Sequence, residues 1–229
     1  AEVAASLQLR GELAATNFNV AGATLDRMQV GFDHIEGEST YIASIQQTLD
    51  RVKKEAHAEM SEGAWIVRVD GIETPALIQK KDGTTLYLTR DIAAALDRYA
   101  RFQFEKSFYV VGEQQRLHFQ QLFGVLKKMG LNWADSCEHL SFGTVLFGDS
   151  RMSTREGKAV YLDDVLSEAQ NRAEVVCTEK NPGLVDKKAV AEAVGIGAVI
   201  FGELSAHRTR DIDFSWEQIL ALDGETGPY

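Results

Sequence analysis

The chain has 229 residues, of which 45% are hydrophobic and 25% charged, a composition that is ordinary for a soluble globular protein. Its formal net charge of −10 argues against broad, nonspecific binding of nucleic acid, which usually requires a basic surface. No apolar run approaches the roughly 18–20 residues of a transmembrane helix, so we expect no membrane partner.

The first elements are short. Apolar residues alternate at Val30 and Phe32, which predicts a short strand. Apolar residues at helical spacing predict a helix over residues 41–60. Residues 63–71 have the pattern of a strand between two turns.

A regular alternation follows. Two apolar stretches around Lys-Asp-Gly predict a hairpin over residues 75–89. Further strands are predicted over 106–112 and 137–147, and helices over 90–102, 113–130, 161–176, 186–204 and 215–222. In the helix over 113–130, the face expected to be buried carries Leu117, Leu122, Val125, Leu126 and Met129. Strands that alternate with helices indicate βαβ crossovers, so we predict an α/β fold with a mainly parallel sheet.

Ligands of a parallel sheet bind beyond the carboxyl ends of its strands, so residues at these ends are the candidates for chemistry. Tyr87 ends a predicted strand and Asp91 opens the next helix. One interpretation makes Asp91 only an N-cap or first-turn acid. The other places the carboxylate and the phenol ring in one pocket, where they suit a planar cationic ligand.

A second pair follows the predicted strand that ends at Gly112. Gln115 and His118 lie three residues apart at the start of a helix, so they share a face. Gln115 offers both a donor and an acceptor. His118 is either a structural residue or a hydrogen-bond partner for ribose or phosphate.

The polar loop "RMSTREG" over residues 151–157 has two interpretations. It is either a surface turn or a loop that binds phosphates through hydroxyl groups, backbone N–H groups and guanidinium. It lacks the spacing of a P-loop.

The glycines and cysteines form no ligand-binding motif. Gly195, Gly197 and Gly202 have the wrong spacing for a dinucleotide fingerprint, so we expect them to serve helix packing. Cys137 and Cys177 have no neighbour at metal-binding spacing. We therefore expect thiols in a reducing compartment and no metal site.

Five segments, in the order of the family, resemble the class I arginyl-tRNA synthetases. Their sequence is most similar to the fungal branch, cytosolic or mitochondrial. They are "KKDGTTLYLTRDIAAALDRY", "YVVGEQQRLHFQQLFGVLKKMG", "EHLSFGTV", "MSTREGKAVYLDDVL" and "DGETGPY". The resemblance runs from about Gly63 to Tyr229 and implies a Rossmann-like sheet. It implies a peripheral segment over 1–62, the second half of the catalytic domain over 63–160, and a helical connection toward the anticodon-binding domain over 161–229.

The resemblance also implies site residues. Those expected to bind the arginine substrate are Tyr87, Asp91 and Gln115. Those expected on the ATP side are His118, Phe142, Gly143, Thr144 and Val145, the last four on the strand whose backbone reads adenine. The second class I signature, "KMSKS", corresponds to Met152, Ser153, Thr154 and Arg155, whose loop closes on the phosphates of ATP. ATP is expected to bring Mg²⁺ with it.

The sequence departs from the family pattern at several points. Arg151 and Thr154 replace the two signature lysines, and Glu156 is acidic where relatives often carry lysine. The HIGH signature is missing. The stretch "HIEG" at His34 resembles it in letters only and is expected to be a turn, and we expect the HIGH signature itself upstream of this region. We therefore expect weak activity from these residues alone.

The implied activity is that of an arginine–tRNA ligase, with L-arginine, ATP and tRNA(Arg) as partners, in the cytoplasm or the mitochondrion. The alternative is a noncatalytic module, derived from a synthetase, that binds arginine or tRNA.

Overall fold

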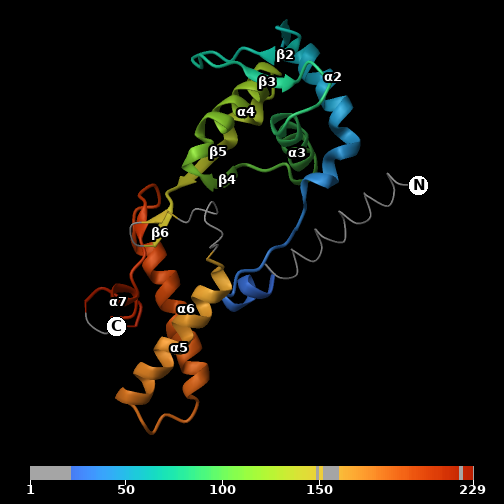
Figure 1. Cartoon of the computed structure of the whole chain (residues 1–229). Helices are drawn as coiled ribbons and strands as arrows, with labels where there is room; N and C mark the ends of the chain where they lie inside the picture. Colours follow the sequence, from blue (N-terminus) through green and yellow to red (C-terminus); the bar gives the residue numbers. More distant parts are fainter. Residues whose placement is uncertain (1–21, 148–149, 152–159, 222–223, 229) are drawn as a thin grey trace. The chain divides into compact units, whose positions relative to one another are not determined.

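The computed structural model describes residues 22–147, 150–151, 160–221 and 224–228 (Figure 1). The chain divides into two compact units, each described by itself. The α/β unit comprises residues 34–143, and the helical unit comprises residues 1–33 together with 144–229. The division at 62/63 and 160/161 refers to the catalytic region of the family and stays a prediction.

The α/β unit contains two small sheets and three longer helices. Its strands are β1 (Glu59–Ser61), β2 (Ala64–Val67), β3 (Ala76–Gln79), β4 (Ser107–Gly112) and β5 (Cys137–Phe142). Its helices are α2 (Ile45–Glu55), α3 (Tyr87–Phe102) and α4 (Arg116–Lys128), with 3₁₀ turns η1 (Glu38–Ser44), η2 (Glu113–Gln115) and η3 (Asn132–Ser136). β4 and β5 pair in parallel and are joined through α4, which makes a βαβ unit.

The predicted α/β class is confirmed, with the parallel pairing confined to short pairs of strands. β4 pairs with β5, and a second parallel pair lies in the helical unit. The sheet β1-β2-β3 is antiparallel throughout, and this pairing was not predicted. β2 and β3 lie in segments predicted as strands, whereas β1 overlaps the end of the helix predicted over 41–60, and the observed helix α2 ends at Glu55. The strands of this sheet have only three or four residues each, too few for a clear periodic pattern.

Two predicted strands are wrong. Residues around Val30 and Phe32 form no strand, and both side chains are exposed. The second arm of the predicted hairpin is reduced to one bridge, between Gln79 and Thr85, and α3 begins at Tyr87. Burial overrides the β preference here, because the fully buried Thr89 donates its Oγ1–H to the carbonyl oxygen of Ile78 at 2.6 Å.

The core of the α/β unit lies between its helices and the sheets. Its fully buried members include Leu49 and Val52 of α2, Ile78 of β3, Ile92 of α3, and Leu122, Val125 and Leu126 of α4. Leu117 was expected on this face but is 44% exposed, whereas Phe119 is 5% exposed. The two residues lie two positions apart, roughly 200° around a helix, so they cannot share a face.

The outer face of β4 has an apolar surface. Phe108 and Val110 lie on this face and are 55% and 67% exposed. Tyr109 and Val111, which alternate with them along the strand, pack against the core. Within the described residues β4 pairs with β5 alone.

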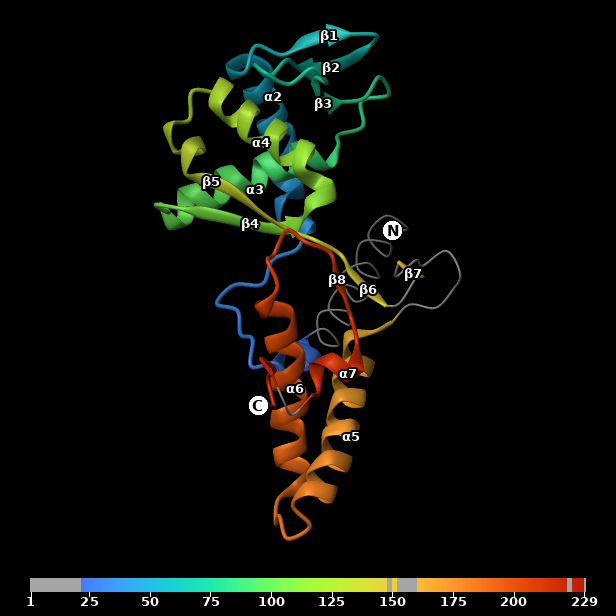
Figure 2. The same ribbon diagram turned by 90° about the vertical axis from the view of Figure 1, so that its left-hand side faces the viewer.

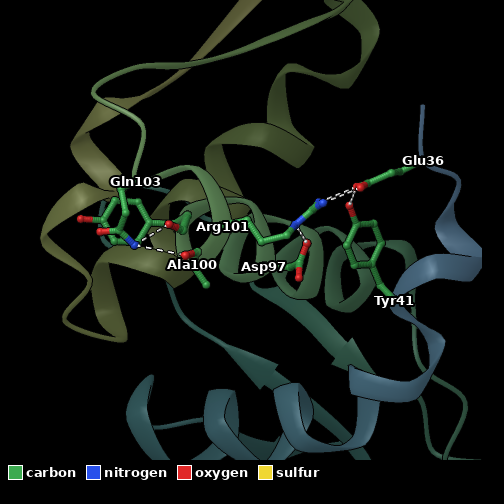
Figure 3. Close-up of polar contacts among 7 residues, drawn as sticks. Glu36, Tyr41, Asp97, Ala100, Arg101 and Gln103 are labelled. Atoms are coloured by element: carbon green, nitrogen blue, oxygen red, sulfur yellow. Dashed lines mark hydrogen bonds and ion pairs between the residues drawn. The ribbon is translucent and has the colours of Figure 1, made fainter. Parts of the chain in front are cut away.

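An ion-pair network attaches the start of the α/β unit to the end of α3 (Figure 3). Arg101 donates to the two carboxylate oxygens of Glu36 at 2.6 and 2.7 Å and to Asp97 at 2.7 Å. The Tyr41 hydroxyl donates to Glu36 at 2.7 Å. The hydrogen bonds from Arg101 and then Tyr41 lower the pKa of the Glu36 carboxyl from 4.5 to about 2.

This shift predicts a contribution to acid stability. A carboxyl whose pKa is lowered on folding stabilises the folded state above its unfolded pKa and loses that effect as the pH falls toward its folded pKa. The contribution of Glu36 is therefore full above about pH 4.5 and lost toward pH 2. In acid titrations followed by circular dichroism, the stability of Glu36→Gln should fall less steeply in this pH window than that of the wild type, because the variant lacks this carboxyl. Identical acid profiles for the two proteins would contradict the assignment.

The helical unit consists mainly of a pair of long helices. Its elements are β6 (Val145–Phe147), β7 (Ser150–Arg151), α5 (Leu162–Lys180), α6 (Lys187–Ser205), β8 (Ile212–Asp213) and α7 (Trp216–Ile219), and residues 22–27 are helical. β6 pairs antiparallel with β7 and parallel with β8. α5 and α6 lie side by side (Figures 1 and 2). No helix in the described part of the chain is long and apolar enough to cross a membrane.

Apolar packing and the hydrogen bonds of one arginine both connect the described parts of this unit. Apolar residues of α5 and α6, among them Leu166, Ala169 and Val199, pack with Phe214. Arg27 reaches α5, where it donates to Asp163 at 2.7 Å, Ser167 at 3.1 Å and Gln170 at 3.3 Å.

Gly195 allows α5 and α6 to approach closely. A Cβ atom at this position would lie 2.6 Å from both the carbonyl carbon and the carbonyl oxygen of Ala169. A Cβ at Gly197 would meet no atom within 4 Å. The predicted packing role is thus confirmed for Gly195, whereas among the described residues nothing lies where a Gly197 side chain would begin.

These two glycines form a matched pair for a test. Gly195→Ala should lower the free energy of unfolding by about 1–3 kcal/mol, because backbone atoms must move. Gly197→Ala should raise it by about 0.5–1 kcal/mol, since alanine is the better helix former. Thermal and urea unfolding of the protein measure both values. Equal effects of the two substitutions would exclude the close contact.

Candidate functional site

Two candidate residues lie on one face of the first two turns of α3. Tyr87 is the first residue of this helix, and Asp91 follows four residues later. The Tyr87 side chain is 66% exposed, and that of Asp91 is 42% exposed. The helix has Leu86 as its N-cap and no acid in its first turn, so Asp91 is neither an N-cap nor a first-turn acid.

His118 connects this face of α3 to α4. Its Nε2 atom lies 2.6 Å from the Asp91 Oδ2 atom, and the His118 side chain is 24% exposed. An ionised carboxylate has no proton, so Nε2–H is the donor. The structure therefore brings together two residues that the sequence placed in separate motifs.

Gln115 and Phe142 lie at the carboxyl edge of the parallel pair. Gly112 ends β4 and pairs with Phe142, which ends β5, and the exposed Gln115 is the N-cap residue of α4. Phe142 is 44% exposed and Gly143 follows it. This is the edge at which parallel sheets bind ligands.

A charge pair accompanies this edge. Arg116 hydrogen-bonds to Glu113 of η2. That bond, with a further one from Ser141, lowers the pKa of the Glu113 carboxyl.

Thr144 and Val145 belong to the helical unit. The backbone groups of Thr144 are hydrogen-bonded to Asp211 and to β8. The Thr144 N–H donates to the Asp211 carboxylate at 2.7 Å, and its carbonyl oxygen accepts from the Ile212 N–H at 2.9 Å. Val145 is paired with Ile212. No pattern in the sequence points to Asp211, because the contact joins residues 67 positions apart and no motif surrounds it.

The residues Met152, Ser153, Thr154 and Arg155 lie outside the described residues. The preceding strand is described: Arg151 of β7 pairs with Leu146 of β6.

The described ranges contain both cysteines of the chain and no cluster of metal-ligating side chains. Cys137 and Cys177 are free thiols, and burial raises the pKa of Cys137 to about 11. Within these ranges no three histidine, cysteine, aspartate or glutamate side chains are placed to hold a metal ion.

Comparison with known proteins identifies the class. Residues 10–216 match the family model "tRNA synthetases class I (R), catalytic domain". The arginine–tRNA ligase of Ligilactobacillus salivarius is 44% identical over 205 residues, which cover 89% of this chain and 36% of that protein. The arginine–tRNA ligase of Streptococcus pyogenes is 46% identical over 206 residues, which cover 89% of this chain and 37% of that protein.

Solved structures agree in fold. The arginyl-tRNA synthetase of Plasmodium falciparum superposes with a TM-score of 0.82 at 23% identity, over 95% of this chain and 37% of that one. The Thermus thermophilus arginyl-tRNA synthetase gives 0.81 at 24% identity, over 96% of this chain and 44% of that one.

The chain belongs to the class I arginyl-tRNA synthetase family and corresponds to part of its catalytic domain. It spans little more than a third of the length of the curated relatives that it matches.

Proposed function

We propose that this chain is the part of an arginine–tRNA ligase that selects L-arginine. In this proposal the parent enzyme joins arginine to ATP, which gives arginyl-adenylate and pyrophosphate, and then transfers the arginyl group to the 3′ end of tRNA(Arg). The observation that carries the proposal is the position of Asp91 beside Tyr87, with His118 bonded to it, near the carboxyl edge of β4 and β5.

Each arginine-binding residue has a role that its chemistry supports. Asp91 is half exposed, so its carboxylate is accessible to the guanidinium group of the substrate. Tyr87 offers a ring face on which a planar cation packs; the Arg90 guanidinium carbon already lies 5.3 Å from this ring centroid. Gln115 is exposed and supplies an amide that both donates and accepts.

We assign the ATP side to Phe142, Gly143, Thr144 and Val145. Because both backbone groups of Thr144 are paired with β8 and Asp211, adenine contacts through this strand fall to its neighbours. The loop over Met152, Ser153, Thr154 and Arg155 is assigned to the ATP phosphates, which would carry Mg²⁺ as their counterion. Charging of tRNA and the two free thiols both suit the cytoplasm or the mitochondrion.

The test is arginine-dependent exchange of pyrophosphate into ATP by the parent enzyme. Arginine should support exchange, whereas lysine and citrulline should not: lysine lacks the planar fork, and citrulline lacks the charge. An enzyme that binds arginine in calorimetry but shows no exchange would instead be a noncatalytic binding module. Equal exchange with citrulline would refute the role of Asp91 as the partner of a cation.

A further inference from the structure

The Asp91 carboxylate is held at one oxygen. His118 Nε2 lies 2.6 Å from Oδ2, and within the described residues this is the hydrogen bond that the Asp91 side chain makes. The bond leaves Oδ1, together with the second lone pair of Oδ2, for a ligand. It also fixes the rotation of the carboxylate plane, which the two side-chain torsions of an aspartate would otherwise leave free.

The histidine is itself held by the packing of the βαβ unit. The His118 ring meets the Phe119 ring edge-on, with centroids 5.3 Å apart. Phe119 is buried and stacks on His139 at 4.5 Å, and the Nε2 of His139 lies 2.9 Å from the Val111 carbonyl oxygen. The orientation of His118 is therefore set by the contact between α4, β4 and β5.

We propose that His118 is a positioning residue for arginine recognition, which fixes the Asp91 carboxylate in the plane that a guanidinium fork requires. A guanidinium needs two acceptors in its own plane, whereas an ammonium group binds as a point charge from many directions. The bond from His118 thus contributes to discrimination against lysine. This inference rests on the proposed function and differs from the resemblance, which places His118 on the ATP side.

The two assignments predict different kinetic effects in the parent enzyme. If His118 positions Asp91, its loss raises the KM for arginine and leaves the KM for ATP unchanged. If His118 contacts ATP, the KM for ATP rises instead. Both constants come from pyrophosphate exchange with one substrate varied at a time.

Two amide variants make the test specific. His118→Gln keeps an N–H donor at nearly the reach of Nε2, whereas His118→Asn has the same chemistry on a side chain one carbon shorter. We expect His118→Asn to raise the KM for arginine about 10-fold, the usual effect of losing one hydrogen bond to a charged group, with kcat within about twofold. His118→Gln should stay within about threefold of wild type. Discrimination between arginine and lysine should fall in His118→Asn and recover in His118→Gln.

A double-substitution cycle supplies the second measurement. If His118 acts through Asp91, then His118→Asn should have little further effect on arginine affinity in an Asp91→Ala background. Additive effects, equal KM values for the two amide variants, or a rise in the KM for ATP would each overturn the positioning role. Failure of the wild-type enzyme to show arginine-dependent exchange would instead overturn the proposed function. Circular dichroism of each variant distinguishes a lost fold from a lost contact.

Discussion

Asp91→Ala in the parent enzyme should lower kcat/KM for arginine by about 100- to 1000-fold. The substitution removes the negative charge that pairs with the guanidinium group, and breaking such a charge-assisted pair costs about 3–4 kcal/mol. The effect should appear mainly in the KM for arginine, since the carboxylate lies on the amino acid side of the proposed pocket. Steady-state exchange measurements with arginine varied at saturating ATP give the value.

The same helix offers a matched control. Asp97 is also a half-exposed aspartate of α3, but it pairs with Arg101 and faces the network around Glu36. Asp97→Ala should leave the KM for arginine within about twofold, because exposed ion pairs contribute little. If the two substitutions have the same effect, Asp91 has no specific role in arginine binding.

Arg155→Ala should lower kcat by about 10- to 100-fold with little change in the KM for arginine. In the proposed function Arg155 belongs to the loop that binds the ATP phosphates, where neither signature lysine is present and Glu156 follows. The phosphates develop negative charge in the transition state. Removing a positive charge beside them therefore destabilises the transition state more than the ground state. Single-turnover formation of the adenylate is the direct measurement.

Glu156→Gln serves as the opposite change in the same loop. It removes the negative charge beside Arg155, so kcat should equal or exceed that of the wild type. A kcat within twofold of wild type for Arg155→Ala would mean that Arg151 or another cation neutralises the phosphates.

The sequence predicted the βαβ part of the fold well, and the reason is physical. β4, α4 and β5 each have one continuous apolar pattern, and Gly130, at a φ of +74°, follows the end of α4, where a left-handed residue ends a helix. The short strands β1, β2 and β3 carried too little periodicity to reveal their antiparallel pairing. The start of α3 was missed because Tyr87 and Thr89 favour strands intrinsically, and the burial of Leu88 and Thr89 on the helix decides otherwise.

The candidate site was predictable as a set of residues but not as a geometry. Local sequence supplied Asp91 as a carboxylate near a helix start and His118 as a histidine one turn into the next helix. Their contact joins positions 27 apart, and no local pattern encodes it. The pairing of Asp211 with Thr144 was missed for the same reason, since it depends on how β8 meets β6.

The exposed outer face of β4 has a practical consequence. Parallel strands are normally covered on both faces, but Phe108 and Val110 are exposed on a strand that, in the described part of the chain, pairs with β5 alone. A polypeptide limited to these residues thus carries a template for self-association during expression and concentration. Handling it at low protein concentration follows directly from the exposure of two apolar side chains on one strand.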